Sequence, residues 1–187
     1  MIKKALLHTA LGIAGSLFIS TAMAADFQLS SPSIKPNSTL TADQVFNGFG
    51  CTGKNISPEL VWSNAPAGTK SFALTVYDPD APTGSGWWHW VVYNLPPTSG
   101  GLPAGAGGSD GTGLPAGTVQ GRTDYGVPGF GGACPPVGNK PHRYQLTLYA
   151  LDIARLPVAA DASAAMVGFF LNAHALGKAS LTWHYGR

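Results

Sequence analysis

The chain has 187 residues, of which 11% are charged, with 11 basic and 9 acidic side chains and a formal net charge of +2 at pH 7. This length is enough for one domain with a hydrophobic core. The few basic residues form no patch that could hold a nucleic-acid backbone, so nucleic acid is not an expected partner.

The N-terminal segment 1–24 has the pattern of a secretory signal peptide. Lys3 and Lys4 precede an apolar run over 5–20, and the segment ends in a small-x-small pattern. The alternative is a membrane anchor, but the run is short for a span and no positively charged flank follows it. We predict cleavage after Ala24, a single mature domain over 25–187 that is close to neutral, no stable membrane span, and a periplasmic or secreted location.

Several later segments have the alternation or composition of strands. Residues 27–40 are polar with scattered apolar positions and predict a short edge strand, and 57–62 lead into a second weak strand. Residues 87–95 are dense in aromatic and β-branched side chains, which is a strong strand signal. Clear alternation of apolar and polar residues predicts three further strands, at 71–77, 142–151 and 179–185.

One helix is expected before the last strand. Asp161 or Ser163 can cap its N-terminus, and Gly177 is a natural C-terminal stop. The apolar face of this helix is predicted at the spacing i, i+3, i+4, i+7 by Met166, Phe169, Phe170 and Ala173. Several strands and one late helix indicate a β-rich α+β fold in which two sheets pack face to face as a β-sandwich.

The segment 96–141 differs in composition from the rest of the chain, with 14 glycines and 8 prolines among its 46 residues. A linker of this composition would leave the last strands and the helix without a partner. Long irregular segments inside a domain are often binding loops. Its second half, 124–136, carries aromatic residues, an acid and a cysteine, so we expect an ordered loop that lines a pocket.

The chain has two cysteines, Cys51 and Cys134. An exported chain reaches an oxidising compartment, where two thiols usually form a disulfide. The competing interpretation is a reactive thiol with His142 as its base. Export favours the disulfide.

Four motifs in order carry a family resemblance: DPDAP at 78–82, GWWHWVVYN at 86–94, DYGVPGFGGACPP at 124–136 and PHRYQLTLYAL at 141–151. Together they resemble the phosphatidylethanolamine-binding protein family, in its bacterial Raf-kinase-inhibitor-like branch. The similarity covers nearly all of 26–187. It implies a β-sandwich with a C-terminal helix and a small anion-accepting pocket at one end.

The resemblance also implies which residues form the pocket, and by position they are Asp78, His89, Pro135, Pro136, His142 and Tyr144. Family members bind phosphorylated head groups and similar anions there, and several inhibit kinases or proteases. An inhibitory or modulating role toward an unidentified protein partner is therefore one expectation. Animal kinase-binding members generally lack this cysteine pair and signal peptide, so a cytosolic kinase is not the expected partner.

The residue chemistry supports a pocket independently of the resemblance. His89, His142 and Tyr144 can each donate a hydrogen bond to an anion, and a protonated imidazole does so with its charge. Asp78 is expected to accept from a histidine, which fixes the tautomer of that ring and raises its pKa so that it stays charged. Asp80 is expected to hold the turn by capping nearby backbone N–H groups.

An enzyme is the alternative function. Asp78, His89 and His142 form a ligand set that zinc accepts, so a metal-assisted or His/Asp-based hydrolase could use the same pocket. The chain has no H-E-x-x-H and no phosphate loop. We therefore expect a binding protein for a small anion such as phosphate or a phosphorylated head group, with no catalytic residue, no metal and no cofactor.

Overall fold

The computed structural model describes residues 25–159 and 161–187. The segment 1–24, in which the signal peptide is predicted, lies outside the described residues. Within the described residues, no helix combines the length and the apolar character that a bilayer crossing requires. The strands are β1 (Gln28–Ser30), β2 (Asn47–Gly48), β3 (Cys51–Thr52), β4 (Leu60–Ser63), β5 (Ser71–Asp78), β6 (Trp87–Leu95), β7 (Gly101–Leu102), β8 (Val119–Gln120), β9 (His142–Leu151) and β10 (Ala175–Tyr185), and the helices are the 3-10 helix η1 (Ala42–Gln44) and α1 (Ala164–His174).

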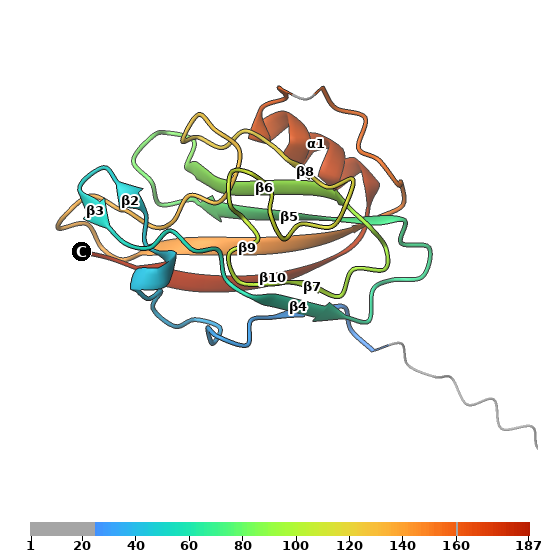
Figure 1. The fold of residues 1–187 in the computed structure, drawn as a ribbon, viewed down its shortest axis with the longest axis horizontal. Helices are drawn as coiled ribbons and strands as arrows, with labels where there is room; N and C mark the ends of the chain where they lie inside the picture. The colour runs from blue at the N-terminus through green and yellow to red at the C-terminus, as the bar shows by residue number, and fades with distance from the viewer. Residues whose placement is uncertain (1–24, 160) are drawn as a thin grey trace, which may run out of the picture.

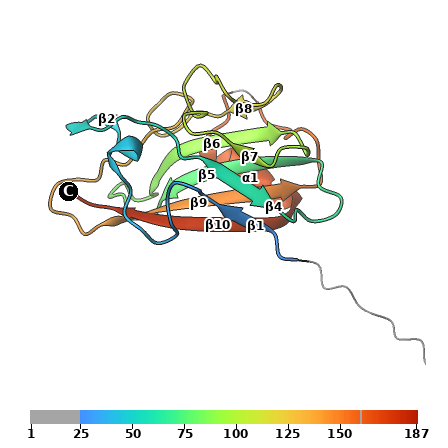
Figure 2. The same cartoon turned by 60° about the horizontal axis from the view of Figure 1, so that its bottom comes forward.

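Two sheets form the body of the molecule. The larger has the order β10-β9-β5-β6-β8 and the smaller the order β1-β4-β7, and every neighbouring pair in both is antiparallel. Figure 2 shows the small sheet lying over one face of the large one. The predicted β-rich α+β sandwich is confirmed, and so are its strands at β5, β6 and β9 and the short edge strand at β1.

The main core lies between the sheets. In β5 the inward side chains are Phe72, Leu74 and Val76, which alternate along the strand as its sequence predicts. They pack with the inward residues of β9 and with Trp62 of β4. The opposite face of the large sheet is also buried, since Ala73 belongs to a second core beneath α1. Burial on both faces explains why β5 is apolar along almost its whole length.

Helix α1 covers the outer face of the large sheet (Figure 1). Ser163 caps it as expected, because its hydroxyl accepts from the backbone N–H of Met166 at 3.2 Å. The predicted apolar face is wrong. Val167 and Leu171 are fully buried against the sheet, whereas Phe169 is 67% exposed and Met166 is also exposed.

The predicted stop at Gly177 is wrong as well. The helix ends at His174, and β10 begins at Ala175 without an intervening loop, four residues earlier than the alternation suggests. Gly177 lies within β10 beside a register shift, and a side chain there would meet Pro66 at 2.8 Å. The glycine thus permits a close approach of the strand to a neighbouring loop rather than terminating the helix.

Candidate functional site

The predicted site residues come from three neighbouring strands. Asp78 is the last residue of β5, His89 lies near the start of β6, and His142 and Tyr144 open β9. Because β5 is antiparallel to both β6 and β9, the end of β5 lies beside the beginnings of the other two. The site therefore lies at the end of the sandwich that carries the C-terminus (left in Figure 1).

Asp78 and His142 form a buried pair. Nδ1 of His142 lies 2.7 Å from Oδ2 of Asp78, and both residues are 3% exposed. The other carboxylate oxygen, Oδ1, accepts from the backbone N–H of Asp80 at 2.8 Å. One carboxylate therefore both orients the imidazole, as expected, and holds the turn that follows β5.

The predicted role of Asp80 needs correction, because Asp78 makes the local backbone contact in this turn. The carboxylate of Asp80 reaches across to β9 and accepts from three N–H groups of Arg143, namely the backbone N–H, Nε and Nη2, at 2.7–2.9 Å. The hydrogen bonds from the guanidinium lower the pKa of Asp80 to about 2. Asp80 thus ties the loop after β5 to the strand that carries His142.

His89 is held by the loop rather than by Asp78. Its Nδ1 lies 2.7 Å from the carbonyl oxygen of Gly131, and the ring is 3% exposed. Burial lowers the pKa of His89, because the surrounding apolar groups cannot replace the hydration of the charged imidazolium. His89 is therefore neutral over a wider pH range than a histidine in water.

The outer wall of the site joins two distant segments. The disulfide predicted between Cys51 and Cys134 is present, and it links β3 to the loop before Pro135. Arg187 contacts the same two segments, with Nε donating to the carbonyl of Pro135 at 2.6 Å and Nη1 to that of Gly50 at 3.0 Å. The disulfide and the guanidinium together hold the wall in place.

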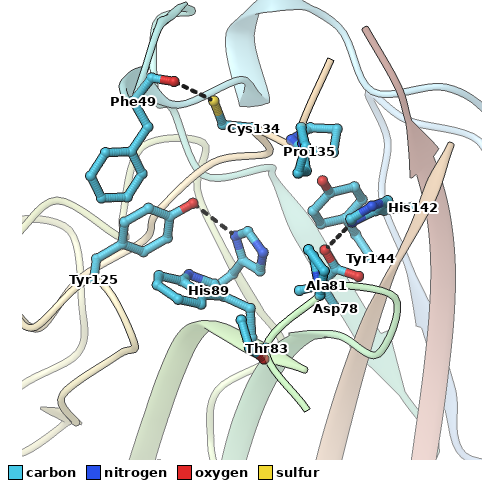
Figure 3. Close-up of a pocket in the computed structure, with 13 residues that line it drawn as sticks. Phe49, Asp78, Ala81, Thr83, His89, Tyr125, Cys134, Pro135, His142 and Tyr144 are labelled. Carbon is cyan, nitrogen blue, oxygen red and sulfur yellow. Dashed lines mark hydrogen bonds and ion pairs between the residues drawn. The ribbon is translucent and has the colours of Figure 1, made fainter. Parts of the chain in front are cut away.

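These elements enclose a cavity of about 170 Å³. Figure 3 shows Asp78, His142 and Tyr144 on one side, Tyr125 and Phe49 on the other, and His89 between them beside Tyr125. The cavity is lined by the six residues that the sequence suggests, Asp78, His89, Pro135, Pro136, His142 and Tyr144, and also by Phe49, Ala81, Pro82, Thr83, Trp87, Tyr125 and Cys134. The structure therefore assembles the predicted set, while the ligand-binding role of these residues stays a prediction.

Two of the aromatic lining residues, Tyr125 and Phe49, are not predicted individually from the sequence. Tyr125 lies in the glycine-rich loop predicted to line a pocket, and its ring packs edge-on against His89 with centroids 5.6 Å apart. Phe49 lies in the turn between β2 and β3, stacks on Tyr125 at 5.8 Å and is 70% exposed. The family motifs signal Tyr125, but nothing in the sequence around Phe49 predicts that this turn reaches the cavity.

Two buried hydrogen-bond donors at the cavity have no partner within 3.5 Å. They are the hydroxyl of Tyr144 and Nε1 of Trp87, both inaccessible to solvent. Nε1 of Trp87 lies close enough to the hydroxyl of Tyr125 to act on the pKa of that group as a longer hydrogen-bond donor. Burial raises the pKa of Tyr144 well above its usual value, so the hydroxyl keeps its proton. A buried donor without a partner costs about 1–3 kcal/mol, and such groups in a native protein often mark a place for a ligand or a water.

The metal-ligand set considered from the sequence is not assembled. Within residues 25–159 and 161–187, no three side chains from His, Cys, Asp and Glu approach closely enough to hold one metal ion. Nδ1 of His142 is bonded to Asp78, and Nδ1 of His89 is bonded to a carbonyl oxygen. The competing interpretation of Cys134 as a reactive thiol is wrong, because its sulfur is in the disulfide.

The fold is a β-sandwich with a small cavity at one end, lined by aromatic residues and by a glycine- and proline-rich loop. The chain belongs to the phosphatidylethanolamine-binding protein family, whose model matches residues 30–186.

Relatives support this assignment over most of the chain. The protein YbcL of Escherichia coli is 57% identical over 162 residues, which cover 87% of this chain and 88% of the relative. YbhB of the same organism is 53% identical over 155 residues, covering 83% of this chain and 97% of the relative. The crystal structure of YbcL, described as a new member of the mammalian family, matches with a TM-score of 0.85 at 56% identity, covering 87% of this chain and 99% of that one.

A more distant relative is named as a lipoprotein. A Mycobacterium tuberculosis protein named as lipoprotein LppC is 41% identical over 106 residues, which cover 57% of this chain and 48% of the relative. The matching region is thus about half of that protein.

Proposed function

We propose that this protein binds a small oxyanion, such as phosphate or a phosphorylated head group, in the cavity between Asp78, His89, His142 and Tyr144. The observation that carries the proposal is the pair of buried donors without partners, the Tyr144 hydroxyl and Nε1 of Trp87, both in the lining of one cavity. An oxyanion supplies several acceptor lone pairs in a small volume, so one ligand can satisfy both donors.

The size of the cavity supports a head group rather than a whole lipid. Its volume of about 170 Å³ is close to the ~150 Å³ of an engineered cavity that holds a benzene molecule. A phosphate with a short substituent fits such a space, whereas two acyl chains do not. The exposed ring of Phe49 at the rim offers an apolar contact to whatever substituent extends from the anion.

We propose further that the protein is not an enzyme. The hydrogen-bond partners of the His142 ring are Asp78 and Asn139, and neither is a serine or cysteine nucleophile. A screen with phosphomonoester, phosphodiester and carboxylic-ester substrates tests this proposal. Turnover that disappears in a His142→Ala variant would favour the alternative hydrolase.

We also propose that the protein is exported and acts in the periplasm or outside the cell. The signal-peptide pattern over 1–24, the Cys51–Cys134 disulfide and the name of the relative LppC support this. N-terminal sequencing of protein from the native host should find Ala25 as the first residue. A soluble, folded protein that retains Met1 would contradict the proposed export.

An inhibitory role toward a protein partner remains part of the proposal. The support is family membership together with exposed aromatic surface at the cavity rim, where Phe49 is 70% exposed. Affinity purification from the periplasm, comparing wild type with Phe49→Ser, tests whether a partner is captured through this rim.

The anion proposal is tested by calorimetric titration of inorganic phosphate and of O-phosphoethanolamine into the purified protein. We expect saturable binding at one site, weakened by Tyr144→Phe. Leu176→Ser is a matched surface control, because Leu176 is exposed and belongs to β10 rather than to the cavity lining. No binding of either anion to the wild-type protein would overturn the proposed function.

A further inference from the structure

We propose that the cavity selects oxyanions that carry a proton, namely hydrogen phosphate and the monoanions of phosphate monoesters, over sulfate and phosphate diesters. This inference rests on the proposed function, since it assumes that an oxyanion occupies the cavity. It follows from the hydrogen-bond partners of two histidine rings, each of which fixes which ring nitrogen carries the proton.

His142 leaves no ring nitrogen free for the ligand. The partner of its Nδ1 is the carboxylate of Asp78 at 2.7 Å, so Nδ1 is the donor of that bond. Nδ2 of Asn139 lies 3.3 Å from Nε2, so the other ring nitrogen also has a protein partner. The acceptor for the ligand must therefore come from the second histidine.

His89 presents this acceptor. Its Nδ1 faces the carbonyl oxygen of Gly131 at 2.7 Å, and a carbonyl oxygen has no proton to give, so Nδ1 is again the donor. Nε2 of the neutral ring is therefore a lone pair, and it has no protein partner among the described residues. Burial of the ring favours this neutral form.

The cavity therefore combines donors with an acceptor. Tyr144 and Trp87 have protons to give and no acceptor within 3.5 Å. The imidazole of His89, which also lines the cavity, offers the lone pair of Nε2. An oxyanion without a proton satisfies the two donors but places one of its own lone pairs against that of Nε2. An oxyanion with a P–O–H group can satisfy the donors and the acceptor.

The charges around the rings lead to the same conclusion. The ionisable groups near them are Asp78 from β5, Asp80 from the following turn, Tyr144 from β9, Tyr125 and Asp124 from the loop over 124–136, and Tyr185, the register partner of His142 in β10. The nearby cations are engaged elsewhere, because Arg143 is paired with Asp80 and Arg187 binds backbone carbonyls. An anion that enters beside the carboxylate of Asp78 must therefore bring a proton or take one up with it.

Sulfate and hydrogen phosphate provide a matched pair of probes. In mildly alkaline buffer both are tetrahedral dianions of similar size, and they differ by one O–H group. Calorimetric titration should show inorganic phosphate binding about tenfold or more tighter than sulfate, because a site with buried acceptors rejects an analogue that lacks the matching donor. O-phosphoethanolamine should likewise bind tighter than glycerophosphoethanolamine, the diester that represents an intact lipid head group.

Proton uptake provides a second readout. The second pKa of a phosphate monoester is about 6, so at neutral pH the dianion predominates and has no P–O–H group. Titration of O-phosphoethanolamine in two buffers that differ in ionisation enthalpy should therefore reveal uptake of about one proton per bound ligand. Fewer protons should be taken up when inorganic phosphate binds, because hydrogen phosphate already carries a proton.

A His89→Gln variant tests whether the imidazole is responsible. The glutamine amide can turn its N–H₂ group toward the ligand, so the preference for phosphate over sulfate should fall toward one. If this variant does not fold, the comparison of phosphate with sulfate in the wild-type protein tests the inference without it. Equal affinity for sulfate and phosphate without proton uptake would overturn the inference alone, whereas absence of all anion binding would overturn the proposed function with it.

Discussion

The carboxylate of Asp78 serves two donors at once, with Oδ2 bonded to Nδ1 of His142 at 2.7 Å and Oδ1 to the backbone N–H of Asp80 at 2.8 Å. Both side chains of the Asp78–His142 pair are about 4% exposed, so water cannot replace either partner. The position of the ring and the shape of the turn after β5 therefore depend on the same two oxygen atoms.

Asp78→Asn should destabilise the protein. The amide has one oxygen in place of two, so the ring N–H of His142 and the backbone N–H of Asp80 compete for it. The donor that loses remains buried without a partner, which costs about 1–3 kcal/mol of the free energy of unfolding. Urea denaturation of the variant and wild type measures this loss. Equal stability would show that the two bonds do not depend on the carboxylate.

The two cavity tyrosines should respond in opposite ways to loss of their hydroxyl groups. The hydroxyl of Tyr144 is buried without a partner, so Tyr144→Phe should leave the ligand-free protein as stable as wild type or more stable. The hydroxyl of Tyr125 donates to the carbonyl of Gly132 at 2.8 Å, so Tyr125→Phe should cost about 1 kcal/mol. Thermal unfolding without added anions compares them, and a Tyr144→Phe protein less stable than Tyr125→Phe would contradict the assignment.

The central strands could be predicted from sequence because their alternation is unambiguous. Helix α1 shows where that reasoning fails, since apolar residues occur on more than one of its faces. The face that packs is the one with Val167 and Leu171, which approach the sheet closely, while the larger Phe169 projects outward. Periodicity records apolar positions but not which of two apolar faces meets a flat sheet.

The sequence predicts only those residues of the candidate site that lie within strong motifs. Asp78, His89 and Tyr144 lie in or beside strands whose pairing places them together. Which histidine contacts Asp78 depends on the register of β5 against β9 and on the loop that occupies Nδ1 of His89, and neither is visible in sequence. Phe49 reaches the cavity through a turn attached by the disulfide, a tertiary contact that local patterns do not report.

The Asp80–Arg143 pair should contribute stability that depends on pH. The pKa of Asp80 is lowered from 3.8 to about 2 by the hydrogen bonds from Arg143, so its contribution is present above about pH 4 and is lost as the pH falls through about 2. Because both side chains are partly exposed, the contribution is about 1 kcal/mol or less.

Asp80→Asn tests this dependence by urea denaturation across the acid range. The variant should be less stable than wild type near neutral pH, and the difference should shrink as the pH falls below about 4. Asp43→Asn is a matched control, because Asp43 pairs with Lys54 at a more exposed position. If the stability difference between Asp80→Asn and wild type does not change with pH, the charge of Asp80 is not the cause of that difference.

The Cys51–Cys134 disulfide should stabilise both the fold and the wall of the cavity. It closes a loop with a sequence separation of 83, for which the chain-entropy model gives about 4–5 kcal/mol. Reduction, or the double change Cys51→Ser and Cys134→Ser, should lower the free energy of unfolding by up to this amount. It should also weaken anion binding, since Phe49 and Pro135 lie on the two segments that the bond joins.

Thermal unfolding and phosphate titration with and without reductant measure both effects. The double variant should be insensitive to reductant, and a wild-type protein with equal stability and affinity in both conditions would show that the bond constrains neither the fold nor the cavity.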